Sequence, residues 1–128
     1  MEPSPQHRIL AVDDDDVILD LLSQTLSSQR YLVDVARTCE DALPKILFND
    51  YSGILIDLVL PDSNGLGLFR QIARRRPALR SRVAFVTGAL DTGEAVRFVS
   101  LVHAPLLRKP FDLGDLINTV RRLTLAEP

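Results

Sequence analysis

The sequence predicts an α/β fold: five parallel strands alternating with five helices in a doubly wound sheet. Two observations carry this prediction. Short and nearly continuous apolar runs recur along the chain, as expected of strands that are covered on both faces. The segments between these runs carry apolar residues at the spacing of one helix face. A sheet of this kind binds ligands at the carboxyl ends of its strands.

The strands can be delimited from the apolar runs. They are predicted at Arg8–Val12, Leu32–Ala36, Ile54–Asp57, Val83–Val86 and Leu106–Arg108. Because crossover connections between parallel strands are right-handed, every strand-to-helix loop should lie at the same edge of the sheet. Polar residues that end different strands are therefore expected to meet there.

The helices are predicted between the strands. The first is expected to begin at Asp15 and Asp16, acids of the run that follows the first strand and suited to capping a helix. Thr38 can cap the second helix, in which Pro44 is expected to bend or loosen the chain. The third follows the turn at 61–65, and the last two cover about 93–102 and 113–123.

Composition predicts one soluble domain. The chain has 128 residues, 46% of them apolar, and a formal net charge of −2. Its core is expected at about 8–123, with loose ends at 1–6 and 124–128. One cysteine, Cys39, suits a reducing compartment, and no long apolar run is present, so we expect a cytoplasmic protein with no membrane partner. The arginines of 70–82 are interpreted as a solvated helix end, and no nucleic-acid binding is expected.

Five chemically capable residues end strands or follow them directly. They are Asp13, Asp14, Asp57, Thr87 and Lys109. Carboxylates that share a small pocket need compensation, and Mg²⁺ with its oxygen ligands is a natural partner. Lys109 could either pair with Asp57 or neutralise a phosphoryl group. A threonine hydroxyl could donate to an anion, and an aspartate could act as the nucleophile. These residue types indicate phosphoryl transfer.

Four motifs carry a resemblance to a known family. They are Ile9-Leu10-Ala11-Val12-Asp13-Asp14-Asp15, Ile54-Leu55-Ile56-Asp57-Leu58-Val59-Leu60-Pro61-Asp62, Val86-Thr87-Gly88 and Arg108-Lys109-Pro110-Phe111. In order and spacing the chain resembles a bacterial response-regulator receiver domain, the phosphoacceptor half of two-component signalling. The resemblance implies a flavodoxin-like sheet of strand order 2-1-3-4-5, with helices on both faces.

The resemblance also implies the chemistry of the site. Asp57 would accept a phosphoryl group from the phosphohistidine of a sensor kinase or phosphotransfer protein, or from acetyl phosphate. Asp13 and Asp14 would hold Mg²⁺ together with Asp57 and the backbone carbonyl of Val59. No organic cofactor is expected, and the domain would be a self-modifying switch, not a turnover enzyme.

Two further residues are assigned by the resemblance. Lys109 would contact the phosphate, next to a Lys109–Pro110 peptide bond that is cis in this family. Thr87 would move toward the phosphate and so carry the switch to an output domain or a downstream protein.

The sequence departs from the family near its fifth strand. Leu106 stands where the family usually has an aromatic residue coupled to the threonine. The segment 102–105 lacks the acidic pair common in receivers that dimerise through their last helices, which leaves dimerisation open. Phe98, Leu101 and Leu106 form a predicted apolar partner surface.

Two alternatives remain open at this stage. Asp13 and Asp15 match the Asp-x-Asp pattern of a haloacid dehalogenase-like phosphohydrolase, a reading that leaves Asp57 without a role. The second alternative is a degenerate receiver that acts only as a binding module.

Overall fold

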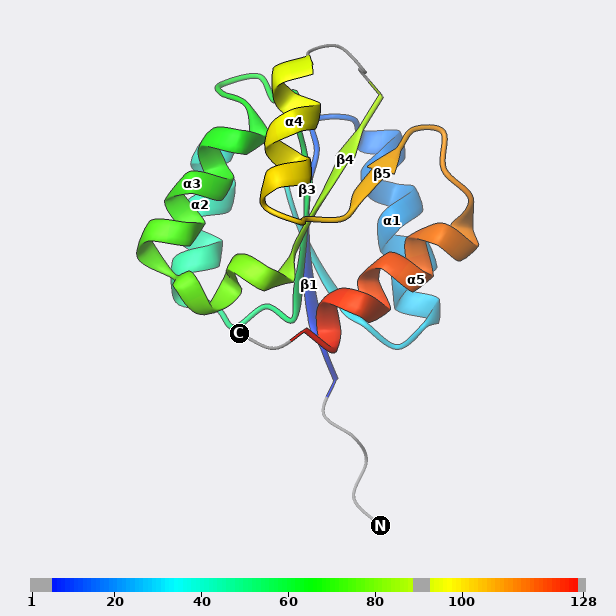
Figure 1. Cartoon of the computed structure of the whole chain (residues 1–128). Coiled ribbons are helices and arrows are strands. Elements are labelled where there is room, and N and C mark those ends of the chain that lie inside the picture. Colours follow the sequence, from blue (N-terminus) through cyan, green and yellow to red (C-terminus); the bar gives the residue numbers. More distant parts are fainter. Residues whose placement is uncertain (1–5, 89–92, 127–128) are drawn as a thin grey trace.

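The computed structural model describes residues 6–88 and 93–126, with the backbone alone for 93–96. It contains the predicted five-stranded parallel sheet in the order β2-β1-β3-β4-β5 (Figure 1). The strands are β1 (Arg8–Val12), β2 (Leu32–Ala36), β3 (Gly53–Asp57), β4 (Val83–Thr87) and β5 (Leu106–Arg108). Every strand bound lies within one residue of its predicted position, so the fold class and strand order are confirmed.

Five α-helices connect or follow the strands. They are α1 (Asp16–Ser28), α2 (Cys39–Phe48), α3 (Gly65–Arg75), α4 (Gly93–Leu101) and α5 (Leu113–Thr124). A short 3-10 helix, η1 (Pro77–Arg82), which the sequence analysis did not anticipate, links α3 to β4. No helix in the described part of the chain is long and apolar enough to cross a membrane.

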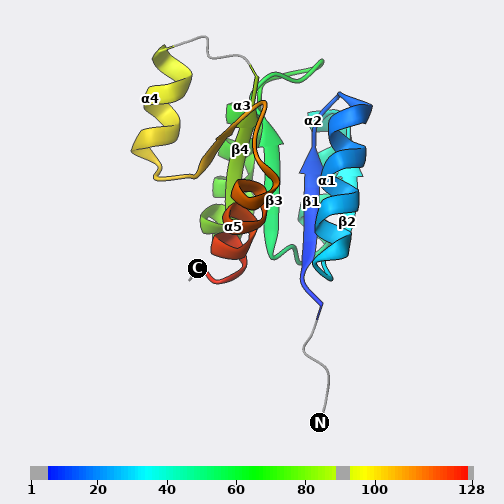
Figure 2. The same cartoon turned by 90° about the vertical axis from the view of Figure 1, so that its right-hand side faces the viewer.

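The helices cover both faces of the sheet. Helices α1 and α5 lie on one face, and α2, α3 and α4 lie on the other (Figures 1 and 2). A hydrophobic core lies on each face of the sheet, and successive strand residues pack into opposite cores. Ile9 packs with α1 and α5, while its neighbour Leu10 packs toward α2 and α3. This burial on both faces explains why the strands read as continuous apolar runs.

Side-chain caps define the beginnings of the first three helices. Asp15 accepts a hydrogen bond from the backbone of α1, as Thr38 does for α2 and Asn64 for α3. Pro44 lies inside α2, exposed to solvent, and the helix runs on to Phe48 beyond it. The cap at Thr38 matches the prediction, and the proline does not end the helix.

Candidate functional site

The carboxyl ends of β1, β3 and β4 bring three polar side chains into the interior. Asp13 is 1% exposed, Asp57 6% and Thr87 2%. Their strands are neighbours in the sheet, and Val86 pairs with Asp57, so Thr87 lies one residue farther toward the same edge. In the described part of the chain these are the only buried polar or charged residues. The three were predicted to meet, and the sheet brings them to one edge.

Lys109 lies at the centre of this acidic group. Its Nζ is 2.7 Å from Oδ2 of Asp13 and 3.1 Å from Oδ2 of Asp57. Its backbone N–H donates to the carbonyl of Thr87 at 2.8 Å, which anchors the segment after β5 to the end of β4. The peptide bond to Pro110 is cis, as the family resemblance implied. Residues nearly a hundred positions apart are thereby held within one hydrogen-bonded cluster.

The burial and charges of the cluster alter its protonation. Burial raises the pKa of Asp13, and the negative charge of Asp57 adds to this rise; the hydrogen bond from Lys109 opposes it. Burial alone would lower the pKa of Lys109, but its hydrogen bonds to Asp13 and then Asp57 raise the pKa above the usual value. The lysine therefore carries its positive charge at neutral pH and offsets the two carboxylates.

Three carboxylates are placed to share a cation. Oxygen atoms of Asp13, Asp14 and Asp57 all lie within 4.8 Å of one another, and no other metal-binding group of this kind occurs among the described residues. Asp14 is exposed and opens the group to solvent, while Asp13 and Asp57 form its buried side. Hard oxygen ligands with room for water suit Mg²⁺, so these residues fit the predicted ion.

The other two acids of the run have different roles. Asp15 caps α1 by accepting from the N–H of Val17 at 2.9 Å, and its own N–H donates to Oδ1 of Asp13. Asp16 forms an ion pair with Arg37 at 2.7 Å. The interpretation that these two acids begin the first helix is therefore confirmed.

The loop after β3 supplies the fourth predicted ligand. The N–H of Val59 donates to Oδ1 of Asp57 at 2.9 Å, which holds both residues in a tight turn. Val59 is 56% exposed, and its hydrogen bond to Asp57 keeps it beside the cluster. Gly65, the first residue of α3, packs directly against the backbone of Asp57.

Sequence reasoning missed one residue of this loop. Asp62 was treated only as part of a turn, but its carboxylate reaches the first two backbone N–H groups of α2. No local pattern identifies this contact, because the usual capping signal expects the cap and the helix to be adjacent in sequence.

The predicted partner surface is only partly exposed. Leu101 is 71% exposed, but Phe98 is half-buried, with its ring against Phe69 at 6.0 Å and the Arg70 guanidinium over it at 5.0 Å. Leu106 is also half-buried and packs on the same core. Phe98 is therefore less exposed than Leu101, since α3 supplies partners that the helical pattern of α4 could not reveal, and the partner surface stays a prediction.

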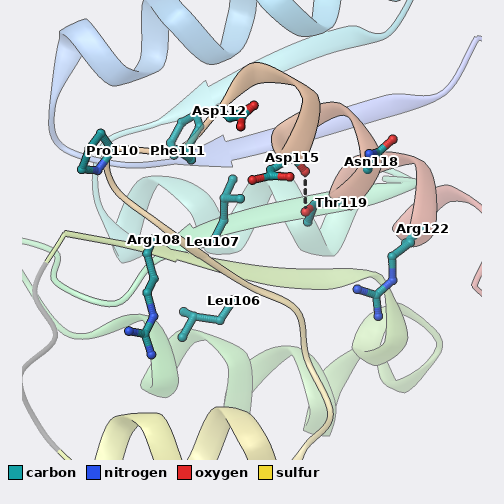
Figure 3. A pocket seen from close by; sticks show the side chains of 10 residues that line it. All are labelled: Leu106, Leu107, Arg108, Pro110, Phe111, Asp112, Asp115, Asn118, Thr119 and Arg122. Carbon is teal, nitrogen blue, oxygen red and sulfur yellow. Dashed lines mark hydrogen bonds between the residues drawn. The ribbon is translucent and has the colours of Figure 1, made fainter.

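A groove of about 520 Å³ lies between β5 and α5 (Figure 3). Leu106, Leu107 and Phe111 are among its apolar lining, and Arg108 and Arg122 lie at its two ends. The lining therefore combines apolar, acidic and basic side chains.

Comparison with known proteins identifies the family of this site. The model of the response regulator receiver domain matches residues 9–121, nearly the whole chain. The chain belongs to this family. Receivers are phosphoacceptor switches of two-component signalling and bind Mg²⁺ at an acidic pocket, which this receiver has at the carboxyl edge of its sheet.

Relatives and solved structures agree with this assignment. The response regulator ArlR of Staphylococcus saprophyticus is 30% identical over 121 residues, covering 94% of this receiver and 54% of ArlR. The transcriptional regulatory protein DltR of Streptococcus agalactiae is 29% identical over 117 residues, covering 91% and 51%. This receiver therefore spans about half the length of these curated relatives.

Solved receivers share the fold throughout. A CheY-like receiver of Methanospirillum hungatei has a TM-score of 0.84 at 32% identity, with 91% of this chain and 92% of that chain covered. The BeF3-activated DrrB receiver domain has a TM-score of 0.79 at 30% identity, covering 93% and 97%.

Proposed function

We propose that Asp57 accepts a phosphoryl group from the phosphohistidine of a sensor kinase or phosphotransfer protein. The observation that carries this proposal is the Lys109 ammonium, hydrogen-bonded to both Asp13 and Asp57 at the open edge of the sheet. A carboxylate at this place has a cation beside it and access to solvent through the neighbouring Asp14.

In the transfer, a carboxylate oxygen of Asp57 forms a bond to phosphorus as the phosphorus–nitrogen bond of the donor breaks. The electron pair of that bond stays with the imidazole nitrogen, and the product is an acyl phosphate. The Lys109 ammonium turns from Asp57 to the new phosphoryl oxygens, donates hydrogen bonds to them and stabilises their negative charge. Mg²⁺, held by Asp13, Asp14, Asp57 and the Val59 carbonyl, would neutralise charge on the phosphoryl oxygens.

The residues that would respond to the new phosphate lie at the ends of β4 and β5. Thr87 ends β4 within this edge, and its backbone already holds Lys109, so both residues can respond to the same anion. We propose that the response alters a partner surface around Leu101 and Leu106, supported by the exposure of Leu101 and by the groove that Leu106 lines. The length of the curated relatives supports a regulator with a further output domain.

The test is adduct formation. The protein is incubated with Mg²⁺ and acetyl phosphate, and the mass is followed; a parallel sample receives beryllofluoride and is followed by amide chemical shifts. We expect one adduct per chain in the native protein, none in Asp57→Asn, and a normal yield in the control Asp20→Asn, which removes an exposed carboxylate on α1. Chelation of Mg²⁺ should abolish the adduct.

The same experiment separates the alternatives. Continuous phosphate release that survives Asp57→Asn and stops in Asp13→Asn would contradict the proposal in favour of a hydrolase. Such a hydrolase is not supported here, since the carboxylate of Asp15 is engaged in capping α1. Absence of any adduct and any shift in the native protein would indicate a binding module only.

A further inference from the structure

The loop between β3 and α3, residues 58–64, is closed at its base. The N–H of Gly65 donates to the carbonyl of Leu58 at 3.0 Å, and Val59 forms an isolated antiparallel bridge with Asn64. These contacts join the two arms of the loop to each other. They do not by themselves tie its tip to the rest of the molecule.

Asp62 supplies a tie from the tip to another element. One carboxylate oxygen accepts the N–H of Cys39 at 3.0 Å, and the other accepts the N–H of Glu40 at 2.9 Å. These are the first two residues of α2, and Thr38 accepts the N–H of the residue that follows them. Asp62 thus completes the cap of a helix that is distant from it in sequence.

The charge of Asp62 suits this position. The hydrogen bonds from Cys39 and then Glu40 lower the pKa of its carboxyl, so the group is ionised at neutral pH. A negative charge at a helix N-terminus is also favoured by the helix dipole. The carboxylate is therefore satisfied by backbone donors of fixed position, which makes it an anchor for the loop and not merely a solvated acid.

The anchored loop carries a group that the proposed metal site needs. Val59 precedes Asp62 by three residues, and the hydrogen bonds of its bridge use the carbonyls of Leu58 and Ser63, not its own. Its exposed side chain contributes little to holding its carbonyl in place. Mg²⁺ demands near-ideal octahedral geometry, so a small displacement of one oxygen ligand weakens binding.

We propose that Asp62 is a positioning residue for the metal site: by fixing the tip of the loop to the N-terminus of α2, it holds the Val59 carbonyl where Mg²⁺ requires it. This inference rests on the proposed function. It assigns to Asp62 an effect on metal affinity without contact to the metal, and it couples α2 to the phosphoacceptor loop.

The test compares Mg²⁺ affinity in three variants, followed by amide chemical shifts during titration with MgCl₂. Asp62→Ala removes both acceptors, and Asp62→Asn keeps one. The control Glu40→Gln removes a negative charge from the same helix end but leaves its backbone N–H in place. Working at about 0.15 M salt limits the Debye length to about 8 Å and so suppresses a general charge effect.

We expect the Mg²⁺ dissociation constant to rise about tenfold in Asp62→Ala, at the lower end of the range known for residues that orient metal ligands. Asp62→Asn should lie between this variant and the native protein, and Glu40→Gln should stay near the native value. At saturating Mg²⁺, Asp62→Ala should still form the beryllofluoride adduct in full, which shows that the variant is folded and that the acceptor is intact.

Three results would overturn the inference while leaving the proposed function standing. One is native Mg²⁺ affinity in Asp62→Ala. Another is an equal loss of Mg²⁺ affinity in Asp62→Ala and in Glu40→Gln, which would assign the effect to charge alone. The third is failure of Asp62→Ala to recover the adduct at saturating Mg²⁺, which would indicate a folding role. A native protein that shows no Mg²⁺-dependent shift would instead contradict the proposed function itself.

Discussion

At the residue scale, two glycines at the start of α3 have opposite surroundings. A methyl group on Gly65 would collide with the backbone oxygen of Asp57 and lie 2.8 Å from Cγ2 of Ile56. A methyl group on Gly67 would come closest to the side-chain oxygen of Ser63 at 3.2 Å, which can rotate away, and would make an ordinary contact with Oδ1 of Asn64 at 3.6 Å. The close approach at Gly65 allows α3 to begin directly beside Asp57.

This difference predicts opposite effects of one substitution. Gly65→Ala should destabilise the protein by about 1–3 kcal/mol, because the backbone that it strikes cannot move without displacing Asp57. Gly67→Ala is the matched control and should be neutral or stabilising by up to about 1 kcal/mol, since alanine favours a helix. Urea unfolding measures both, and equal values for the two variants would contradict the prediction.

At the element scale, Arg76 closes the carboxyl end of α2. Its guanidinium donates to the backbone carbonyls of Ile46 and Asn49 at 2.9 and 3.2 Å, and it pairs with Asp50 at 2.9 Å. Helix ends leave carbonyls without intrahelical partners, and a cation is favoured there by the helix dipole. Arg82 does the same for α5, donating to the carbonyl of Leu123 at 3.2 Å.

Arg76→Ala should therefore lower the free energy of unfolding by about 1–2 kcal/mol, because it leaves partly buried carbonyls without donors. The adjacent Arg75 is exposed on α3 and provides the control: Arg75→Ala should change stability by less than about 0.5 kcal/mol. Chemical denaturation of both variants checks the prediction. A loss confined to Arg75→Ala would show that these contacts of Arg76 contribute nothing.

At the scale of the whole molecule, the proposed metal site joins the ends of strands that are distant in sequence. The acidic cluster and its ion pairs with Lys109 form only when β1, β3, β4 and β5 are assembled. A ligand that binds only the folded chain stabilises it by mass action. The free energy of unfolding of the whole domain should therefore rise when Mg²⁺ binds.

We predict that Mg²⁺ at ten times its dissociation constant adds about 1.4 kcal/mol to stability. This should raise Tm by about 5 °C for a domain of this size. The rise should vanish in Asp13→Asn, which removes a buried ligand, and persist in Asp20→Asn. Thermal unfolding followed by circular dichroism measures it, and a shift of equal size in Asp13→Asn would place the ion elsewhere.

Much of this receiver could be predicted because its signals are local. Apolar runs marked the strands to within a residue, and the caps at Asp15 and Thr38 followed from side chains next to the helices that they begin. The meeting of Asp13 and Asp57 followed from the rule that parallel strands present their carboxyl ends at one edge. Local patterns and one rule of topology were sufficient.

The rest depended on contacts between distant segments, which no local pattern encodes. Arg76 and Arg82 resemble Arg75 in sequence, yet the fold directs the first two onto helix ends. Phe98 lies half-buried because α3 supplies Phe69 beside it.

Taken by itself, the sequence determined which strands form, their order through the family resemblance, and which acids end them. Only the tertiary structure decided that Lys109 joins Asp13 to Asp57 and that Asp62 caps α2 from the neighbouring loop. The physical reason is that a strand or helix arises from periodicity along the chain, whereas a hydrogen bond between segments depends on their positions in space.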